Sequence, residues 1–212
     1  MKKIVQKIEQ SLCDFYNLKP DESAKDFLLD EKIADKAFLE FITQKGIDPQ
    51  RAATLFQLDD DGFLDINIFF SKKLKNSLEE NCPLEELSLK NIDAFCALAE
   101  EISHFHFIID HCHRDEPFSL LELEWQGEID RFLSCVFLLQ EQSGSSHYRQ
   151  LFSLFFEEEY RTHLSPFKER YIEASYLARK YLAKNIPKGL FSMRNTFRAS
   201  FKEKLTMIRQ PA

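Results

Sequence analysis

Glycine is scarce in this chain, and its scarcity excludes several kinds of site. Only five of the 212 residues are glycine, and the sequence contains no GxGxxG, GxxxxGKS, GxxxxGKT or GxSxG. The common dinucleotide-binding, phosphate-binding and nucleophile-elbow motifs are therefore missing, as is HExxH. A catalytic site assembled from distant residues would leave no such signature. The absences favour a non-enzymatic protein and leave the question of an enzyme open.

Paired cysteines and long apolar runs are missing as well. The five cysteines form no CxxC pair, and an odd number cannot all be joined within one chain. No segment offers about 18 consecutive uncharged apolar residues, and the N-terminal stretch lacks the apolar region of a signal peptide. We therefore expect a cytoplasmic protein in a reducing compartment, with no transmembrane segment.

Acidic residues are depleted at one end of the chain. The net charge is −7, with 28 Lys and Arg against 35 Asp and Glu. Residues 1–160 contain 16 of these basic and 32 of these acidic residues, whereas residues 161–212 contain 12 and 3. This asymmetry predicts either a surface for an anionic partner or two parts of one fold that attract each other. We favour the second interpretation.

The hydrophobic spacing predicts a mainly α protein. We expect a multi-helix bundle, with about five helices in the C-terminal two-thirds, and a small β-hairpin in the N-terminal third. The expected helices cover about residues 2–18, 31–45, 91–114, 118–142, 146–163, 166–184 and 189–208. Residues 1–85 would hold the first helices and the hairpin, and residues 86–212 the bundle with its basic C-terminal helices, in one compact unit.

The hairpin is predicted by ATLFQL and FLDINIFF around the turn DDDG. Apolar and polar residues alternate in the second run, as in a half-buried strand. Because an isolated hairpin is marginal in water, it should pack on helices or pair with a third strand. The DDDG turn does not fit a calcium loop, because Gln57 would occupy its first position and Ile68 its twelfth.

The segment AEEISHFHFIIDHCH, residues 99–113, is rich in possible metal ligands. On a helix its histidines form two pairs, His104 with His111 and His106 with His113, and each pair is two turns or about 10 Å apart. Neither pair can chelate one ion alone, because side chains three or four positions apart are the ones that converge. Glu101-x-x-His104 is the half-motif of di-metal helical bundles, but the chain offers no second Glu-x-x-His.

Glu128 is the unusual residue of the next helix, since it falls within an otherwise apolar arc. A carboxylate there must be paired, hydrogen-bonded or protonated. We favour a buried ion pair that fixes the helix register, with His106, His113 or an arginine of the basic end as partner. A metal site would instead combine Glu101, His104 and Glu128 with His106 or His113.

The basic excess lies in the last two expected helices. Their candidate binding residues are Arg179, Lys180, Arg194, Arg198, Lys202 and Arg209. Arg194, Arg198 and Lys202 are four positions apart, so on a continuous helix they would share one face. Such a face could dock on the chain's own acidic part, an acidic protein, a phosphate backbone or an anionic membrane surface.

Four runs resemble a known family: SHFHFI, SLLELEWQGEIDRF, RYIEASYLARKYL and RNTFRASFKEKLTMIR. Together they are similar to a family of uncharacterised bacterial proteins of similar length, over most of the chain. The resemblance implies a bacterial origin and carries no activity, ligand or catalytic residue.

Three functions follow as hypotheses. The first is a non-enzymatic binding or adaptor protein that directs its basic helices toward an acidic protein partner. The second is a helical-bundle metalloprotein with a Glu/His site, a metal ion being the one cofactor we leave open. The third is a nucleic-acid-binding accessory protein, whose affinity would fall steeply with salt.

Overall fold

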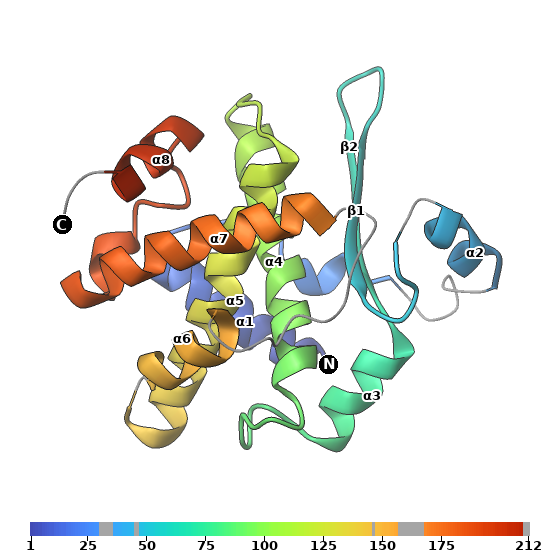
Figure 1. The fold of residues 1–212 in the computed structure, drawn as a ribbon. Coiled ribbons are helices and arrows are strands. Elements are labelled where there is room, and N and C mark those ends of the chain that lie inside the picture. The colour runs from blue at the N-terminus through green and yellow to red at the C-terminus, as the bar shows by residue number, and fades with distance from the viewer. Residues whose placement is uncertain (30–35, 45–46, 146, 157–167, 210–212) are drawn as a thin grey trace.

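The computed structural model describes residues 1–29, 36–44, 47–145, 147–156 and 168–209. Within these ranges it has eight α-helices and one two-stranded sheet, which confirms the predicted mainly α fold with an N-terminal hairpin (Figure 1). The elements are α1 (Lys2–Tyr16), η1 (Ala24–Asp26), α2 (Lys36–Gln44), β1 (Ala52–Leu58), β2 (Leu64–Phe70), α3 (Lys72–Glu80), α4 (Ile92–His113), α5 (Leu120–Ser143), α6 (Tyr148–Phe156), α7 (Lys168–Asn185), η2 (Ile186–Lys188), η3 (Leu190–Met193) and α8 (Phe201–Arg209).

Helices α4 and α5 form the centre of the molecule. They pack on each other, α7 crosses them, and α1 contacts both (Figure 1). A capping box between Ser119 and Glu122 begins α5, and Gly144 ends it with a left-handed φ of 72°. Both helices are buried on almost all sides, as expected for central helices. The polar residues of α5 must therefore find partners inside the protein.

The hairpin has the predicted strands and lies beside α4. Ala52 pairs with Phe70 at one end of the ladder and Leu58 with Leu64 at the other. A third segment completes it, since Leu29 N–H donates to the Ile68 carbonyl (2.9 Å) and Ile68 N–H donates to the Phe27 carbonyl (2.8 Å). The segment before residue 30 is thus the missing neighbour of β2.

Helix α3 is absent from the sequence prediction. Ser71 caps it, because its hydroxyl accepts a hydrogen bond from Leu74 N–H (3.3 Å). The helix buries only Leu74 and Leu78. Two apolar positions in nine residues give a weak periodic signal, and the cap is the stronger evidence in this segment.

The predicted last helix, residues 189–208, is wrong as a single element. Gly189 adopts a φ of 90°, and η3 and several turns follow before α8 begins. Ser200 and Glu203 then form a capping box, in which Ser200 N–H donates to the Glu203 carboxylate (2.8 Å) and Glu203 N–H donates to Ser200 Oγ (3.4 Å). Because of this break, three basic residues expected on one helical face do not share one: Arg194, Arg198 and Lys202.

Some predictions fall on residues outside the described ranges. These are the start of the helix expected at 31–45, the last part of the helix expected at 146–163 and the start of the helix expected at 166–184. In the parts of the chain that the structure does describe, no helix has the length and apolarity needed to cross a membrane.

A buried polar network joins α1, α4, α5 and α8. Asp130 accepts hydrogen bonds from the Tyr16 hydroxyl (2.5 Å), the Ser103 hydroxyl (2.5 Å) and Gln126 Nε2 (2.9 Å). Lys204 Nζ reaches Gln126 Oε1 (3.1 Å) from α8. All five side chains are buried, and each hydrogen bond replaces one that water would otherwise make. The network fixes how the first and last helices attach to the centre.

Removing the Tyr16 hydroxyl should therefore destabilise the protein. Tyr16→Phe leaves Asp130 and Gln126 with one partner fewer in a buried place, which costs about 1–3 kcal/mol. Urea unfolding monitored by circular dichroism measures the change. Tyr176→Phe, at an exposed position on α7, is the control and should stay within about 0.5 kcal/mol of the parent. Equal effects of the two substitutions would contradict a stabilising role for the network.

Candidate metal centre

His104 lies in the α4–α5 interface, and a contact at its Nδ1 atom fixes the orientation of the ring. The Glu101 carboxylate lies 3.4 Å from Nδ1, one turn earlier on α4. Glu101 is held in turn by the hydroxyl of Thr54 on β1, which donates to Oε2 (2.7 Å). A carboxylate that accepts from one ring nitrogen keeps the hydrogen there and leaves the lone pair on the other nitrogen. The ring is thus oriented with Nε2 toward α5.

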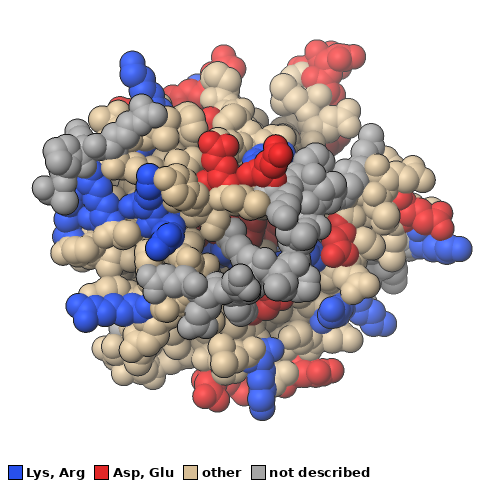
Figure 2. Space-filling view, viewed as in Figure 1, with Lys and Arg blue, Asp and Glu red and all other residues tan. Residues whose placement is uncertain are grey.

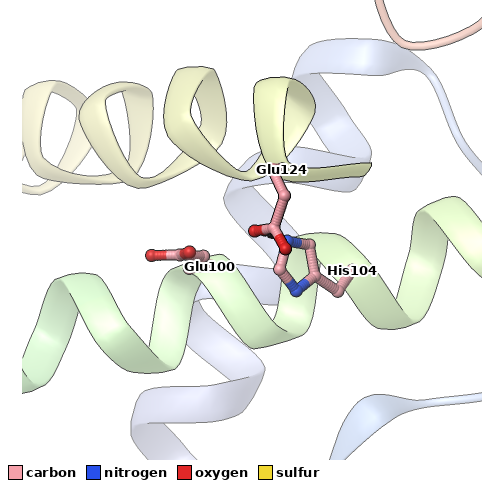
Figure 3. Close-up of side chains that lie close together, drawn as sticks. All are labelled: Glu100, His104 and Glu124. Carbon is pink, nitrogen blue, oxygen red and sulfur yellow. Dashed lines mark ion pairs between the residues drawn. The ribbon is translucent and has the colours of Figure 1, made fainter. Parts of the chain in front are cut away.

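Two further carboxylates lie on the Nε2 side. Glu124 Oε2 of α5 is 3.7 Å from Nε2, and Glu100 approaches from the preceding turn of α4. One donor atom from each of Glu100, His104 and Glu124 lies within 4.8 Å of the others. Figure 3 shows the imidazole and Glu100 on α4, with the Glu124 side chain descending from α5 onto the ring.

Gly127 gives the imidazole its space. A Cβ atom at this position of α5 would lie 2.7 Å from His104 Nε2 and 3.1 Å from Glu100 Cγ, closer than ordinary van der Waals contact. Glycine inside a helix costs roughly 0.5–1 kcal/mol relative to alanine. His104 and Glu100 can approach α5 this closely only because position 127 is glycine, in spite of its lower helix stability.

The two atoms that face each other in this centre lack hydrogen-bond partners. His104 Nε2 and Glu124 Oε2 are both buried and have no hydrogen-bond partner within the described part of the protein. Their separation of 3.7 Å exceeds a hydrogen bond. Two ligands that each lie about 2.1 Å from one ion are roughly 3.0–4.2 Å apart, and the observed distance falls in that range.

The charge balance around the ring favours a cation. Four carboxylates and two guanidinium groups act on the centre: Glu100, Glu101, Glu124 and Glu128 against Arg131 and Arg170. Arg170 Nη2 donates to Glu124 Oε1 (3.0 Å), which leaves Oε2 as the oxygen directed at the ring. The acidic groups outnumber the basic ones, so an added proton or metal ion reduces the imbalance.

Protonation at the centre is displaced toward high pH. Burial lowers the pKa of His104, but Glu101, Glu124 and Glu100 outweigh it and raise the value to about 9. Burial raises the pKa of Glu124 to about 7, although His104 and Arg170 oppose the shift. The metal-free centre therefore holds a proton at neutral pH.

The structure does not bring the five predicted metal ligands together. Glu101 and His104 are neighbours, but Glu101 occupies the orienting side of the ring. Burial and the nearby Glu100 raise the pKa of Glu128, whose carboxylate accepts from Arg131 on its own helix (2.9 Å). That ion pair is the buried pair expected for Glu128, with a partner we did not predict.

The other two predicted histidine ligands have partners elsewhere. His106 Nε2 lies 2.9 Å from Glu9 Oε1 and so links α4 to α1. His113 lies 3.6 Å from Glu22 at the protein surface. Each ring thus has a carboxylate partner other than Glu128, and both contacts have a structural explanation.

Glu100 and Glu124 are the members of this cluster that the sequence prediction missed. Glu100 is four residues before His104, which is a converging spacing, and this signal could have identified it. Glu124 carries no comparable signal, because its approach to His104 depends on the packing of α5 on α4. The nearby glycine was the only local indication of a close contact.

The predicted basic binding residues are in different situations. Arg198 donates to Asp110 Oδ1 from Nε (3.1 Å) and Nη2 (2.8 Å) and is thus docked on the acidic part of the chain. Four others are exposed: Arg179 and Lys180 on α7, Arg194 after η3, and Lys202 on α8. The side chain of Arg209 lies outside the described part of the structure.

Comparisons with protein-family models, curated proteins and solved structures find no match to this chain. The resemblance to a bacterial family, and the bacterial origin that it implies, stay predictions. We therefore infer the function from the geometry of the described residues.

The metal-free protein should lose stability as the pH rises from about 5 to about 8. The pKa values of Asp130, Glu124 and His104 are raised to about 6, 7 and 9, so the folded chain binds more protons than the unfolded chain in this range. The stabilisation is complete below the unfolded pKa values and is lost as the pH passes the folded ones. Urea unfolding at several pH values, with a chelator present, measures the slope.

Two variants show whether the pH dependence of stability comes from the buried centre or from surface carboxylates. Glu124→Gln should flatten the slope, because it removes one raised pKa and weakens another. Glu85→Gln, at an exposed position, should leave the slope unchanged. Stability that rises with pH over this range in the parent protein would contradict the expected protonation.

Proposed function

We propose that this protein binds one divalent transition-metal ion between α4 and α5, with His104 Nε2, Glu124 and Glu100 as ligands. The observation that supports this most is the pair of buried atoms without hydrogen-bond partners, His104 Nε2 and Glu124 Oε2, which face each other 3.7 Å apart. Leaving two such atoms without a hydrogen bond costs free energy. An ion between them would satisfy both.

The surrounding residues support the same role. Metal-ligating histidines generally donate their other N–H to a carboxylate or carbonyl, and such partners orient the ring and raise its basicity. Glu101 is in that position, and Thr54 orients Glu101. Arg170 holds the second oxygen of Glu124. His104 is thus supported from β1 through Glu101, and Glu124 is supported from α7.

The donor set indicates the class of metal. One imidazole nitrogen and two carboxylates, without a thiolate, suit Mn²⁺, Fe²⁺ or Zn²⁺. Three protein ligands leave further coordination positions for water or a small ligand. We infer a metalloprotein with an open coordination sphere. This is the metalloprotein hypothesis from the sequence, with a different set of ligands.

Metal content and calorimetry test the proposal. Protein purified without a histidine tag should contain Mn, Fe or Zn, or take up Mn²⁺ or Zn²⁺ in titration calorimetry after chelation. His104→Gln and Glu124→Gln should abolish uptake, and Glu101→Gln should weaken it about 10- to 100-fold, as expected for an orienting partner. Because the ion must replace the proton on His104, binding at pH 7 should also release a proton, which titration in buffers of different ionisation enthalpy detects.

The matched control is His113→Gln, which removes an exposed histidine from the same helix. It should bind metal like the parent protein. The proposal fails if the parent takes up none of the three metals, or if His113→Gln reduces uptake as strongly as His104→Gln does. Circular dichroism and urea unfolding check that each variant is folded.

Gly127→Ala gives a separate test of the close packing. On an ordinary helix this change would be stabilising, but here the new methyl group would displace the imidazole that Glu101 holds. We expect metal affinity to fall at least about tenfold, as for lost support of a ligand. Calorimetry measures the affinity. Unchanged affinity would show that the imidazole does not need its present position.

A further inference from the structure

One outer surface of the protein carries exposed cations that the fold does not use. We name it the α7–η3 surface and define it by Tyr176, Arg179, Lys180, Lys188, Phe191 and Arg194. All six residues are exposed. Its four cations form no ion pair with another residue in the described part of the chain, in contrast to Arg198, which docks on Asp110.

Two aromatic rings project from the same surface. Phe191 is 73% exposed and Tyr176 is 51% exposed. Each ring has a cation over it, since Arg194 lies 4.3 Å from the centre of the Phe191 ring and Lys180 lies 4.4 Å from that of Tyr176. Cations and rings are thus presented together, with the rings in contact with water.

The chain between α7 and α8 is not one continuous helix, and this interruption shapes the α7–η3 surface. Gly189 adopts its positive φ of 90° two residues after Pro187. This turn places Lys188 and Phe191 on a corner between α7 and α8 instead of inside a continuous helix. A continuous helix would have directed successive side chains around its axis.

Charge is distributed unevenly over the molecule. Lys and Arg gather on the side occupied by the end of α7 and by α8, whereas the projecting tip of the hairpin carries acidic residues (Figure 2). The tip contains Asp59, Asp60 and Asp61. An anionic surface would therefore attract one side and repel the other, which orients the molecule.

We propose that the α7–η3 surface docks on an anionic lipid bilayer. Its cations would lie among the headgroups, and the Phe191 ring would leave water at the boundary with the acyl chains. Basic residues and aromatic rings together are the composition of interfacial binding surfaces. A nucleic acid or an acidic protein would use the same cations, but a bilayer also accounts for a projecting apolar ring.

Vesicle sedimentation tests this with the full chain. The protein should sediment with phosphatidylcholine vesicles that contain phosphatidylserine and not with phosphatidylcholine alone, and high salt should release it. Arg179→Gln with Arg194→Gln should lower binding about 25-fold, from about fivefold for each cation. Phe191→Ala should lower it about fivefold at constant charge.

The control variant is Lys72→Gln with Lys73→Gln, which makes the same charge change at exposed positions on α3. It should bind anionic vesicles like the parent. Equal loss in both double variants would overturn the proposal, as would binding without phosphatidylserine. Binding to RNA or to an acidic peptide, with none to anionic vesicles, would assign the surface to the other class of partner. All substituted residues are exposed, and circular dichroism confirms folding.

Discussion

The fold depends on satisfying the polar residues of a helix that is buried on almost all sides. Helix α5 places Glu124, Gln126, Glu128, Asp130 and Arg131 in the interior. Burying such groups alone costs far more than the stability of a typical domain can absorb. Their partners come from α1, α4, α7, α8 and α5 itself, so the arrangement of the other helices follows from the needs of this one.

Two of these interior networks differ in a way that bears on function. Asp130 receives three hydrogen bonds from three different side chains, and it has no unused buried oxygen within the described structure. His104 Nε2 and Glu124 Oε2 face each other across the same helix pair and have no hydrogen-bond partner within the described structure. A saturated network is sufficient to hold helices together. The two atoms without hydrogen bonds are the reason why we propose a ligand site there.

The sequence predicted the features that depend on local periodicity and local turn chemistry. The central helices, the hairpin with its DDDG turn and the burial of Glu128 all followed from spacing and from residue type. The break before residue 189 was predicted, since the expected helices end at residue 184 and begin again at 189. The interruption between residues 193 and 201 was missed, because residues 189–208 keep helical spacing throughout. The serine cap at Ser200 was the signal against one continuous helix, and periodicity outweighed it.

Only part of the candidate site could be predicted from the sequence, for a physical reason. Glu101 and His104 share one helix, so their proximity follows from helical geometry. Glu124 meets them only because α5 packs with Gly127 against the ring. The prediction treated α5 as a one-sided amphipathic helix, and on that assumption Glu124 should point to solvent. A central helix has no solvent side, and its charged residues become interior groups. Three features together identify such a helix: acidic residues on all its faces, a glycine in its interior and a length of more than 20 residues.

The asymmetry of charge is explained in part by attraction within the fold, which is the interpretation that we favoured from the sequence. Part of the basic excess serves the fold, since Arg170 neutralises Glu124, Arg198 docks on Asp110 and Lys204 enters the interior beside Gln126. If intramolecular attraction were the whole cause, the remaining cations would also approach carboxylates, because surface side chains reorient freely. Arg179, Lys180, Lys188 and Arg194 instead lie exposed, with Lys180 and Arg194 over aromatic rings. The acidic hairpin tip lies on another side of the molecule (Figure 2). These cations without an ion pair are the ones that the proposed anionic bilayer would contact.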